Sequence, residues 1–183
     1  KTGIEIHAFL EEIKEQIEIV AGYHDEQEIE LKLYGTFLIK YFSLNDSLIP
    51  KIIEDYDLSN GLPIFRIIKL LVDNDILFEI REKQIFNNEF HTLHENDFKT
   101  LNELSLELGV TRERVRQIRL QFLNTFDSKF RFITQHEIKS LINYNLDLSP
   151  FLIDISDDII DRINDLEKVQ FNRLFIIRIL VLL

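Results

Sequence analysis

The side chains best suited to chemistry lie in one short stretch, residues 111–117. It reads Thr-Arg-Glu-Arg-Val-Arg-Gln. An arginine can pair with guanine O6 and N7, a glutamine can pair with adenine, and a glutamate can accept a hydrogen bond from the amino group of cytosine. On a helix, Arg112 and Arg116 would share a face, with Glu113 and Gln117 beside them. The stretch therefore combines groups that read base edges with groups that hold phosphates.

Two short helices are expected to position these side chains. Leu101, Leu104 and Leu108 follow one another at helical spacing and give the first helix an apolar face. The second helix repeats this spacing with Val115, Ile118 and Phe122. We expect the two apolar faces to pack on each other.

The ends of both helices are also marked in the sequence. Thr100 and Glu103 have the spacing of a capping box, which starts the first helix. Gly109 can adopt the positive φ that ends this helix, and Thr111 can cap the second one. A capped helix, a glycine turn and a second capped helix are the pattern of a helix-turn-helix, which places its second helix in the major groove of DNA.

Arg112 and Arg114 lie where the helix dipole disfavours cations, in the first turn of the second helix. A local rule broken in this way is expected at functional positions. The other interpretation is a solvated basic stripe on an ordinary helical hairpin. The capped, glycine-turned spacing is more specific than a charge run and favours DNA recognition.

Residues 108–118, Leu-Gly-Val-Thr-Arg-Glu-Arg-Val-Arg-Gln-Ile, also resemble region four of the sigma-70 family of bacterial RNA polymerase specificity factors. Thr100-Leu101 and Glu103-Leu104 are similar to the family's entry into the preceding helix. Upstream, Arg81-Glu82, Ile85-Phe86 and Phe90 resemble the opening helix of the region. The resemblance covers residues 76–126 and implies an all-α fold, double-stranded promoter-like DNA as the ligand, and RNA polymerase core as a protein partner.

The resemblance also implies roles for individual residues in a recognition helix over residues 111–125. Arg112, Glu113 and Gln117 would face bases of the minus-thirty-five promoter element. The phosphate contacts would come from Arg114 and Arg116, to which we add Thr111 and Arg119.

The chain departs from the family pattern at several positions. The family usually continues the recognition helix with basic residues, where this chain has Gln121, Asn124 and Thr125. It also has an arginine before the residue matching Phe90, where this chain has Glu89. Each lost phosphate contact lowers the affinity for DNA and the dependence of that affinity on salt. We therefore expect a weaker hold on the DNA backbone.

Charge is distributed unevenly along the chain. The net charge is −11, from 21 Lys and Arg against 32 Asp and Glu. Residues 111–131 contain six basic and two acidic residues, so the rest of the chain carries −15. A positive island in an acidic chain favours selectivity over non-specific DNA binding. The acidic surfaces are alternatively suited to a basic protein partner.

Composition limits the other classes of function. The chain has 183 residues, 45% of them hydrophobic, which suffices for a core of one or two small domains. It contains no cysteine, which excludes disulfides and thiol catalysis and is compatible with the cytoplasm, where we expect the protein to act. The apolar run 171–183 is interrupted by Arg173 and Arg178 and is too short for a membrane anchor.

Signals for catalysis and cofactors are absent from the sequence. No phosphate-binding glycine loop, nucleophile elbow or carboxylate pair is recognisable, so we expect neither an enzyme nor a cofactor. His91, His94, Glu95 and Asp97 lie close together, but they fall in an expected loop without a distant partner cluster. We interpret them as solvated loop residues, not as metal ligands.

The organisation expected from these patterns is an all-α, multi-helix bundle that contains the sigma region-four-like helix-turn-helix. We predict an N-terminal helical region (1–75), the helix-turn-helix domain (76–132) and a C-terminal helical region (133–183). We expect the chain to be a fragment, with this last region cut short. Residues 6–20 keep a narrow apolar seam, which could mediate self-association or pack within the same domain. Further helices are expected at 27–42, 47–56, 63–74, 134–144, 149–164 and 168–183.

The segment that opens the region resembling region four has two interpretations. Ile76, Phe78 and Ile80 alternate, which fits a strand or a winged hairpin. We follow the family resemblance and expect a helix from residue 76.

The sequence thus predicts a sequence-specific DNA-binding protein of sigma-factor-like type, acting in bacterial transcription initiation or its regulation. The alternative is a protein-interaction module. It would keep the helix-turn-helix fold to contact RNA polymerase or a regulator, without binding DNA tightly.

Overall fold

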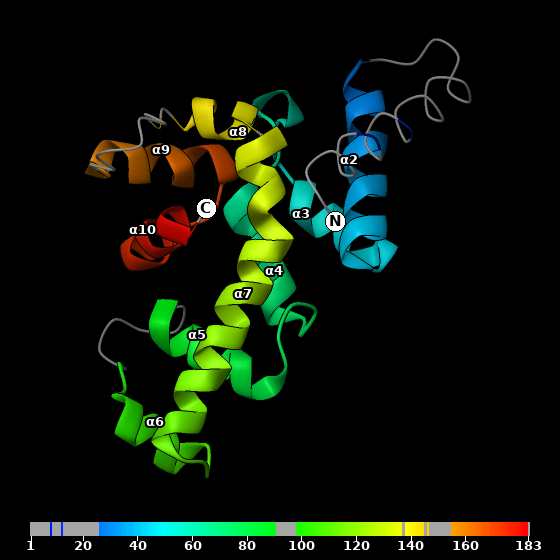
Figure 1. Ribbon diagram of the computed structural model, residues 1–183. Helices are drawn as coiled ribbons and strands as arrows, with labels where there is room; N and C mark the ends of the chain where they lie inside the picture. The colour runs from blue at the N-terminus through cyan, green and yellow to red at the C-terminus, as the bar shows by residue number, and fades with distance from the viewer. Residues whose placement is uncertain are drawn as a thin grey trace. The chain divides into compact units, whose positions relative to one another are not determined.

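The fold is all-α over the part of the chain that the computed structural model describes (Figure 1). The described residues are 8, 12, 26–90, 98–136, 138–144, 146 and 155–182. Every regular element among them is an α-helix or a short 3-10 helix. The all-α prediction is therefore confirmed for these residues. The predicted seam over residues 6–20 and the loop 91–97 lie outside them, apart from Ala8 and Glu12.

The chain divides into two compact units, each made of two stretches of sequence. Unit 1 comprises Lys1–Ile67 and Phe132–Val169, and unit 2 comprises Ile68–Arg131 and Gln170–Leu183. The three regions expected from the sequence were consecutive, whereas here the C-terminal stretch is divided between both units. Two helices, α4 (Ile64–Asp73) and α7 (Arg112–His136), contribute residues to both units.

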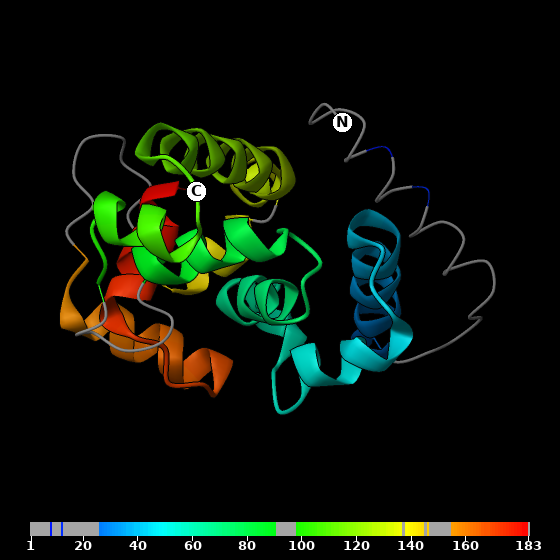
Figure 2. The same cartoon turned by 90° about the horizontal axis from the view of Figure 1, so that it is seen from below.

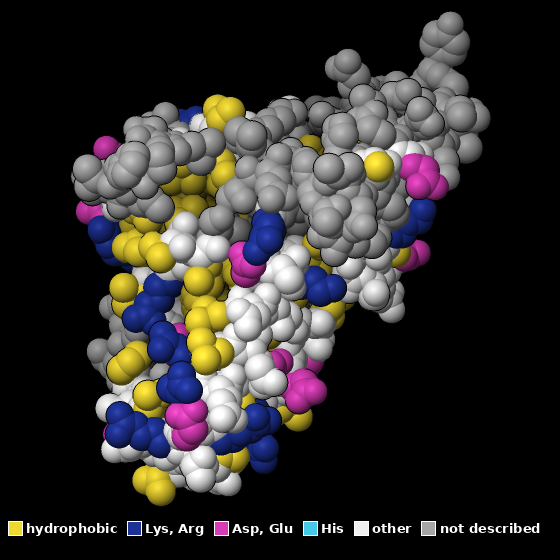
Figure 3. Space-filling view, in the orientation of Figure 1, with side chains coloured by type: hydrophobic (Ala, Val, Ile, Leu, Met, Phe, Trp, Pro, Cys, Tyr) yellow, Lys and Arg dark blue, Asp and Glu magenta, His cyan; other side chains and the backbone are white. Residues whose placement is uncertain are grey.

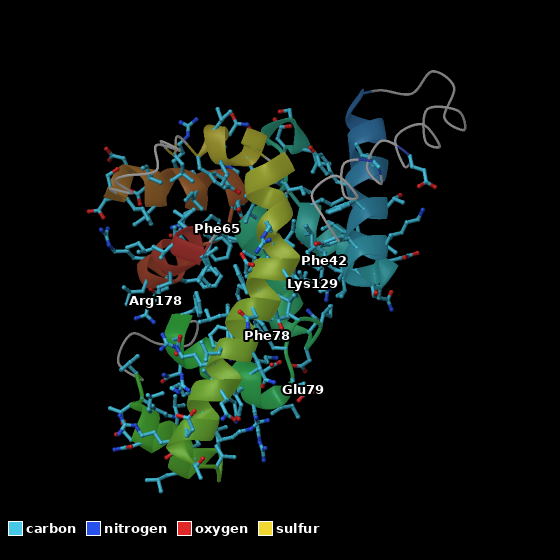
Figure 4. The ribbon with its side chains drawn as sticks, in the orientation of Figure 1. Phe42, Phe65, Phe78, Glu79, Lys129 and Arg178 are labelled. Atoms are coloured by element: carbon cyan, nitrogen blue, oxygen red, sulfur yellow. The ribbon has the colours of Figure 1, made fainter. Side chains whose placement is uncertain are left out.

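Unit 1 is built mainly from short helices. Apart from its shares of α4 and α7, its elements are α2 (Glu26–Phe42), η1 (Asp46–Leu48), α3 (Ile49–Ile53), η2 (Leu58–Asn60), α8 (Ile138–Asn143) and α9 (Asp157–Glu167). Its apolar core includes Phe37, Leu38, Ile52 and Phe65, all with almost no exposed surface. Figure 4 labels Phe65 on α4.

A buried carboxylate connects three of these elements in unit 1. The Oε1 atom of Glu167, at the end of α9, accepts hydrogen bonds from Phe65 N–H (3.1 Å) and from the Tyr144 hydroxyl (2.5 Å). Its Oε2 atom accepts from Arg66 N–H (2.7 Å). The Arg66 guanidinium donates in turn to the backbone oxygens of Glu167 and Ile52. Glu167 thus satisfies backbone N–H groups in the first turn of α4, which have no partner within their own helix.

Unit 2 is built around aromatic rings. Its elements, besides the end of α4 and most of α7, are α5 (Ile80–Phe90), α6 (Leu101–Glu107) and α10 (Arg173–Leu182). The Phe86 ring lies 4.3 Å from that of Phe90 and 6.0 Å from that of Phe122, and Phe78 lies 5.2 Å from Phe86, measured between centroids. Figures 1 and 2 show α5 and α6 beside the first half of α7. The aromatic cluster fixes the position of α7, the helix that carries the predicted recognition residues.

The opening of α5 differs from the prediction. The sequence was expected to be helical from residue 76, but α5 begins at Ile80. Asp75 has a positive φ of 56° and ends α4 in a turn. Lys83 stabilises this turn, because its amine donates to Asp73 O (2.9 Å) and Asp75 Oδ1 (2.7 Å). The turn buries Phe78 and leaves Glu79 and Ile80 exposed (Figure 4).

Other predicted helix boundaries differ from those observed, and two of these differences have a local cause. The helix expected over 47–56 is replaced by η1 and α3, and Asp55 beyond them has a positive φ. The helix expected over 168–183 begins only at Arg173, because Lys168 adopts a left-handed conformation after α9. The helices expected over 134–144 and 149–164 are observed as α8 and as α9, and residue 137 and residues 147–154 lie outside the described part. The predictions for α2 and α4 are confirmed to within one residue.

Candidate nucleic-acid interface

The two helices that were predicted to form the reading element are present with their predicted caps. The Thr100 hydroxyl accepts from Glu103 N–H (3.3 Å), and the Glu103 carboxylate accepts from Thr100 N–H (2.7 Å), which completes the capping box. Gly109 has a φ of 62°, as the turn requires. The Thr111 hydroxyl accepts from Arg114 N–H (3.1 Å) and so caps α7. The ends of both helices are therefore fixed by contacts within the motif.

One side of α7 is buried. Val115, Ile118, Phe122, Phe126 and Phe130 have at most 3% of their surface exposed. They recur every three or four residues, so they form a single stripe along the helix. This stripe continues past residue 125 to Phe130, and α7 itself extends to His136, beyond the residue where the recognition helix was predicted to end.

The opposite side of α7 is exposed. All the predicted site residues are exposed. They are Thr111, Arg112, Glu113, Arg114, Arg116, Gln117 and Arg119. Seen along the helix, Glu113 and Gln117 lie almost opposite the buried stripe, and Arg112 and Arg114 lie on its two flanks. Figure 3 shows Lys and Arg side chains gathered over α6 and the first half of α7, with acidic side chains between them. We call the exposed residues 111–117 of α7 and the turn before it the reading face.

Side chains on the reading face bind each other. The Arg116 guanidinium donates to both carboxylate oxygens of Glu113, at 2.9 and 2.7 Å. This hydrogen bond lowers the pKa of Glu113 and raises the pKa of Arg116. Arg114 Nη1 donates to Gln117 Oε1 at 3.3 Å. Because all four side chains are exposed, these contacts can be exchanged for contacts to a ligand at little cost.

Arg119 differs from the other predicted phosphate contacts. Its Nε lies 2.5 Å from Oε1 of Glu89 on α5, and the Glu89 side chain is only 14% exposed. Burial raises the pKa of Glu89, and the nearby Arg119 and Arg178 partly lower it again. Glu89 therefore holds Arg119 toward α5. This places Arg119 at the edge of the reading face.

Two further residues lie on the exposed side of α7 and were not predicted as site residues. Leu120 is 47% exposed and lies seven residues, or two helical turns, after Glu113. Asn124 is also exposed and lies seven residues after Gln117. Leu120 is apolar, but it falls outside the helical periodicity of the buried stripe. The spacing of seven residues from Glu113 and Gln117 could have identified Leu120 and Asn124. They extend the reading face along α7.

No cluster of three or more potential metal ligands occurs among the described residues, and residues 91–97 are not among these. Within the same described ranges, none of the helices combines the length and apolar character that crossing a bilayer requires.

Comparisons with family models, with curated proteins and with solved structures found no match for this chain.

Proposed function

We propose that this chain is a sequence-specific DNA-binding protein of sigma-factor-like type, acting in bacterial transcription initiation or its regulation. In this proposal the first half of α7 enters the major groove of a promoter-like duplex. The observation that carries the proposal is the reading face, where exposed glutamate and glutamine side chains lie opposite the buried stripe and exposed arginines lie on its flanks.

The geometry of the two helices supports this function. The caps at Thr100 and Thr111 and the positive φ of Gly109 fix the turn, and the aromatic cluster fixes α7. A rigid support of this kind holds base-reading side chains in place before DNA binds, which lowers the cost of ordering them. Arg112, Glu113 and Gln117 then read bases, and Arg114 and Arg116 contact phosphates.

The internal pairs of the reading face fit the same function. In the free protein Glu113 and Arg116 satisfy one another. On DNA, Arg116 would transfer to a phosphate and release Glu113 to accept from a cytosine amino group. Because Glu113 repels phosphates unless it finds a donor, its position favours selectivity over general affinity for DNA.

The test compares two arginine variants of the full chain on a duplex selected for binding and on an unrelated duplex. Arg112→Ala should weaken binding to the selected duplex by about 1–3 kcal/mol and leave the unrelated duplex nearly unaffected. Arg116→Ala should weaken binding to both duplexes by the same factor. Arg131→Ala is the matched control, because it lies on α7 about 28 Å beyond Arg112.

Fluorescence anisotropy at near-physiological salt measures these affinities. An Arg112→Ala variant that loses the same factor on both duplexes would contradict a base-reading role. If the wild-type chain shows no measurable affinity for any duplex, the protein-interaction module becomes the better account.

A further inference from the structure

A pocket of about 420 Å³ lies within unit 2, between helices α5, α6, α7 and α10. Most of its lining is apolar, and it includes the buried side chains of Phe90 and Leu104 together with Leu123 and Leu182. Val181, at 66% exposure, also lines it. Pockets that bind small ligands have this size and are mainly apolar, with a few polar groups that orient the ligand.

The polar groups of the pocket carry an excess of positive charge. Arg119 and Arg178 both line it, and Glu89 is the one carboxylate among its lining residues. Arg119 forms the ion pair with Glu89, whereas Arg178 acts on Glu89 only at longer range. Lys99, a third cation of the lining, is bound to Glu107 at 2.7 Å. Within the described residues, Arg178 is thus the guanidinium of this pocket that makes no hydrogen bond.

Arg178 occupies a position from which it can bind a ligand. It is half-buried on α10, between this helix and α5 (Figure 4). Apolar surroundings strengthen the attraction between a guanidinium and an anion, because the local dielectric constant is lower than in water. The planar, forked donors of an arginine match the geometry of a carboxylate or a phosphate, and the single negative charge of a carboxylate matches the one guanidinium of the described lining that makes no hydrogen bond. A ligand of this pocket would therefore need an apolar part to contact the lining and an anionic group to bind the Arg178 guanidinium.

We propose that this pocket binds an amphiphilic monocarboxylate, an organic acid with one carboxylate and an apolar tail. The carboxylate binds Arg178 beside the pair formed by Glu89 and Arg119. The tail lies on the apolar lining formed by Phe90, Leu104 and Leu123. This proposal does not depend on DNA binding, since none of the base-reading residues lines the pocket.

Octanoate is the probe, titrated into the full chain by isothermal calorimetry. We expect saturable binding of one octanoate per chain. Acetate lacks the tail and octyltrimethylammonium carries the opposite charge, so each should bind at least about tenfold more weakly. Equal binding of octanoate and octyltrimethylammonium, or no saturable binding of octanoate, would overturn the proposal.

A pair of variants on α10 assigns the carboxylate contact. Arg178→Gln should weaken octanoate binding at least about tenfold, because it removes a hydrogen bond between charged groups. Arg173→Gln is the matched control on an exposed position outside the pocket and should change binding less than twofold. Circular dichroism checks that both variants are folded. Octanoate affinity that is unchanged in folded Arg178→Gln would contradict the assignment.

A second variant tests the pocket without altering a lining arginine. Val181→Asp places a negative charge on an exposed lining residue, where it should not disturb the core. It should weaken octanoate by repulsion and strengthen the binding of octyltrimethylammonium. If neither affinity changes, octanoate binds elsewhere and the proposal is wrong.

Discussion

Glutamate and arginine meet in both units of this protein, but in opposite environments. In unit 1 the Glu167 carboxylate is completely buried and accepts from Phe65 N–H, Arg66 N–H and Tyr144, while its backbone oxygen accepts from the Arg66 guanidinium. In unit 2 the side chains of Glu113 and Arg116 pair on the surface of α7, each 57% exposed.

The difference shows which polar contacts belong to the fold and which are available for a ligand. Removing a buried carboxylate leaves several donors without partners, so the arrangement in unit 1 is fixed. An exposed pair exchanges its partners with water at little cost. The Glu167 arrangement therefore contributes to stability, and the Glu113 arrangement is the one that we propose for recognition.

The largest effect is expected from Glu167→Ala. This substitution leaves the N–H groups of Phe65 and Arg66 buried without an acceptor, and it removes the shorter of the two hydrogen bonds that the Tyr144 hydroxyl donates. The free energy of unfolding in urea should fall by about 3–5 kcal/mol. Glu113→Ala is the matched control and should leave the unfolding midpoint nearly unchanged. Similar unfolding midpoints for the two variants would contradict the claim that the contacts of Glu167 stabilise the fold more than those of Glu113.

The second prediction concerns the pH dependence of stability in unit 1. Burial raises the pKa of Glu167 from 4.5 to about 7, while hydrogen bonds from Tyr144, Phe65 and Arg66 and the charge of Arg66 lower it in part. Because the pKa of Glu167 is raised in the folded state, this group's contribution to the free energy of unfolding is complete below about pH 4.5 and is lost as the pH rises through 7. The free energy of unfolding should therefore fall by about 3 kcal/mol over this range.

Glu167→Gln, which cannot titrate, separates this effect from that of other groups. The stability difference between wild type and this variant should be larger at pH 5 than at pH 8, as measured by urea unfolding. The burial of Tyr144, which keeps its pKa well above 10, prevents its ionisation in this range. A difference that is equal at both pH values would show that Glu167 does not titrate as expected.

A smaller effect is expected at Leu120, and it depends on the proposed DNA binding. An exposed apolar side chain on a reading face can contact the methyl group of thymine. Replacing the contacted thymine by uracil should weaken the wild type about fourfold, or about 0.8 kcal/mol. Leu120→Ala should bind both duplexes equally. If the chain binds its selected duplex and no replacement of thymine by uracil changes the affinity, Leu120 does not contact a thymine methyl group. The proposed DNA binding would not be affected by that result.

The smallest effect is expected for Arg119, on the salt dependence of DNA affinity. Arg114→Ala should reduce the slope of log affinity against log salt concentration by about 0.9, the value for one lost phosphate contact on duplex DNA. Arg119→Ala should reduce it by clearly less, since Glu89 holds this guanidinium. Equal slopes for the two variants would show that Arg119 leaves Glu89 to bind DNA.

Local features of the reading element could be predicted from the sequence. The capping box of Thr100 and Glu103, the positive φ of Gly109 and the cap at Thr111 each depend on residues no more than three positions apart. The buried stripe of α7 was recognisable because it repeats at helical spacing. The solvent exposure of Arg112, Glu113 and Gln117 followed from the same periodicity.

Features that depend on distant residues could not be predicted. Glu167 caps a helix about one hundred residues earlier, and no spacing in the sequence indicates this contact. The pair between Arg119 and Glu89 joins two helices that meet only after folding. Asp75 has a positive φ that its type permits but does not require, so the start of α5 was placed too early.

A selection of bound sequences from a random duplex pool, using the full chain, tests whether α7 reads DNA. We expect the selection to recover one consensus sequence, and we expect Arg112→Ala to relax this consensus at a single base pair. Recovery of unrelated sequences at the background frequency, with a folded protein, would contradict the claim that α7 reads DNA.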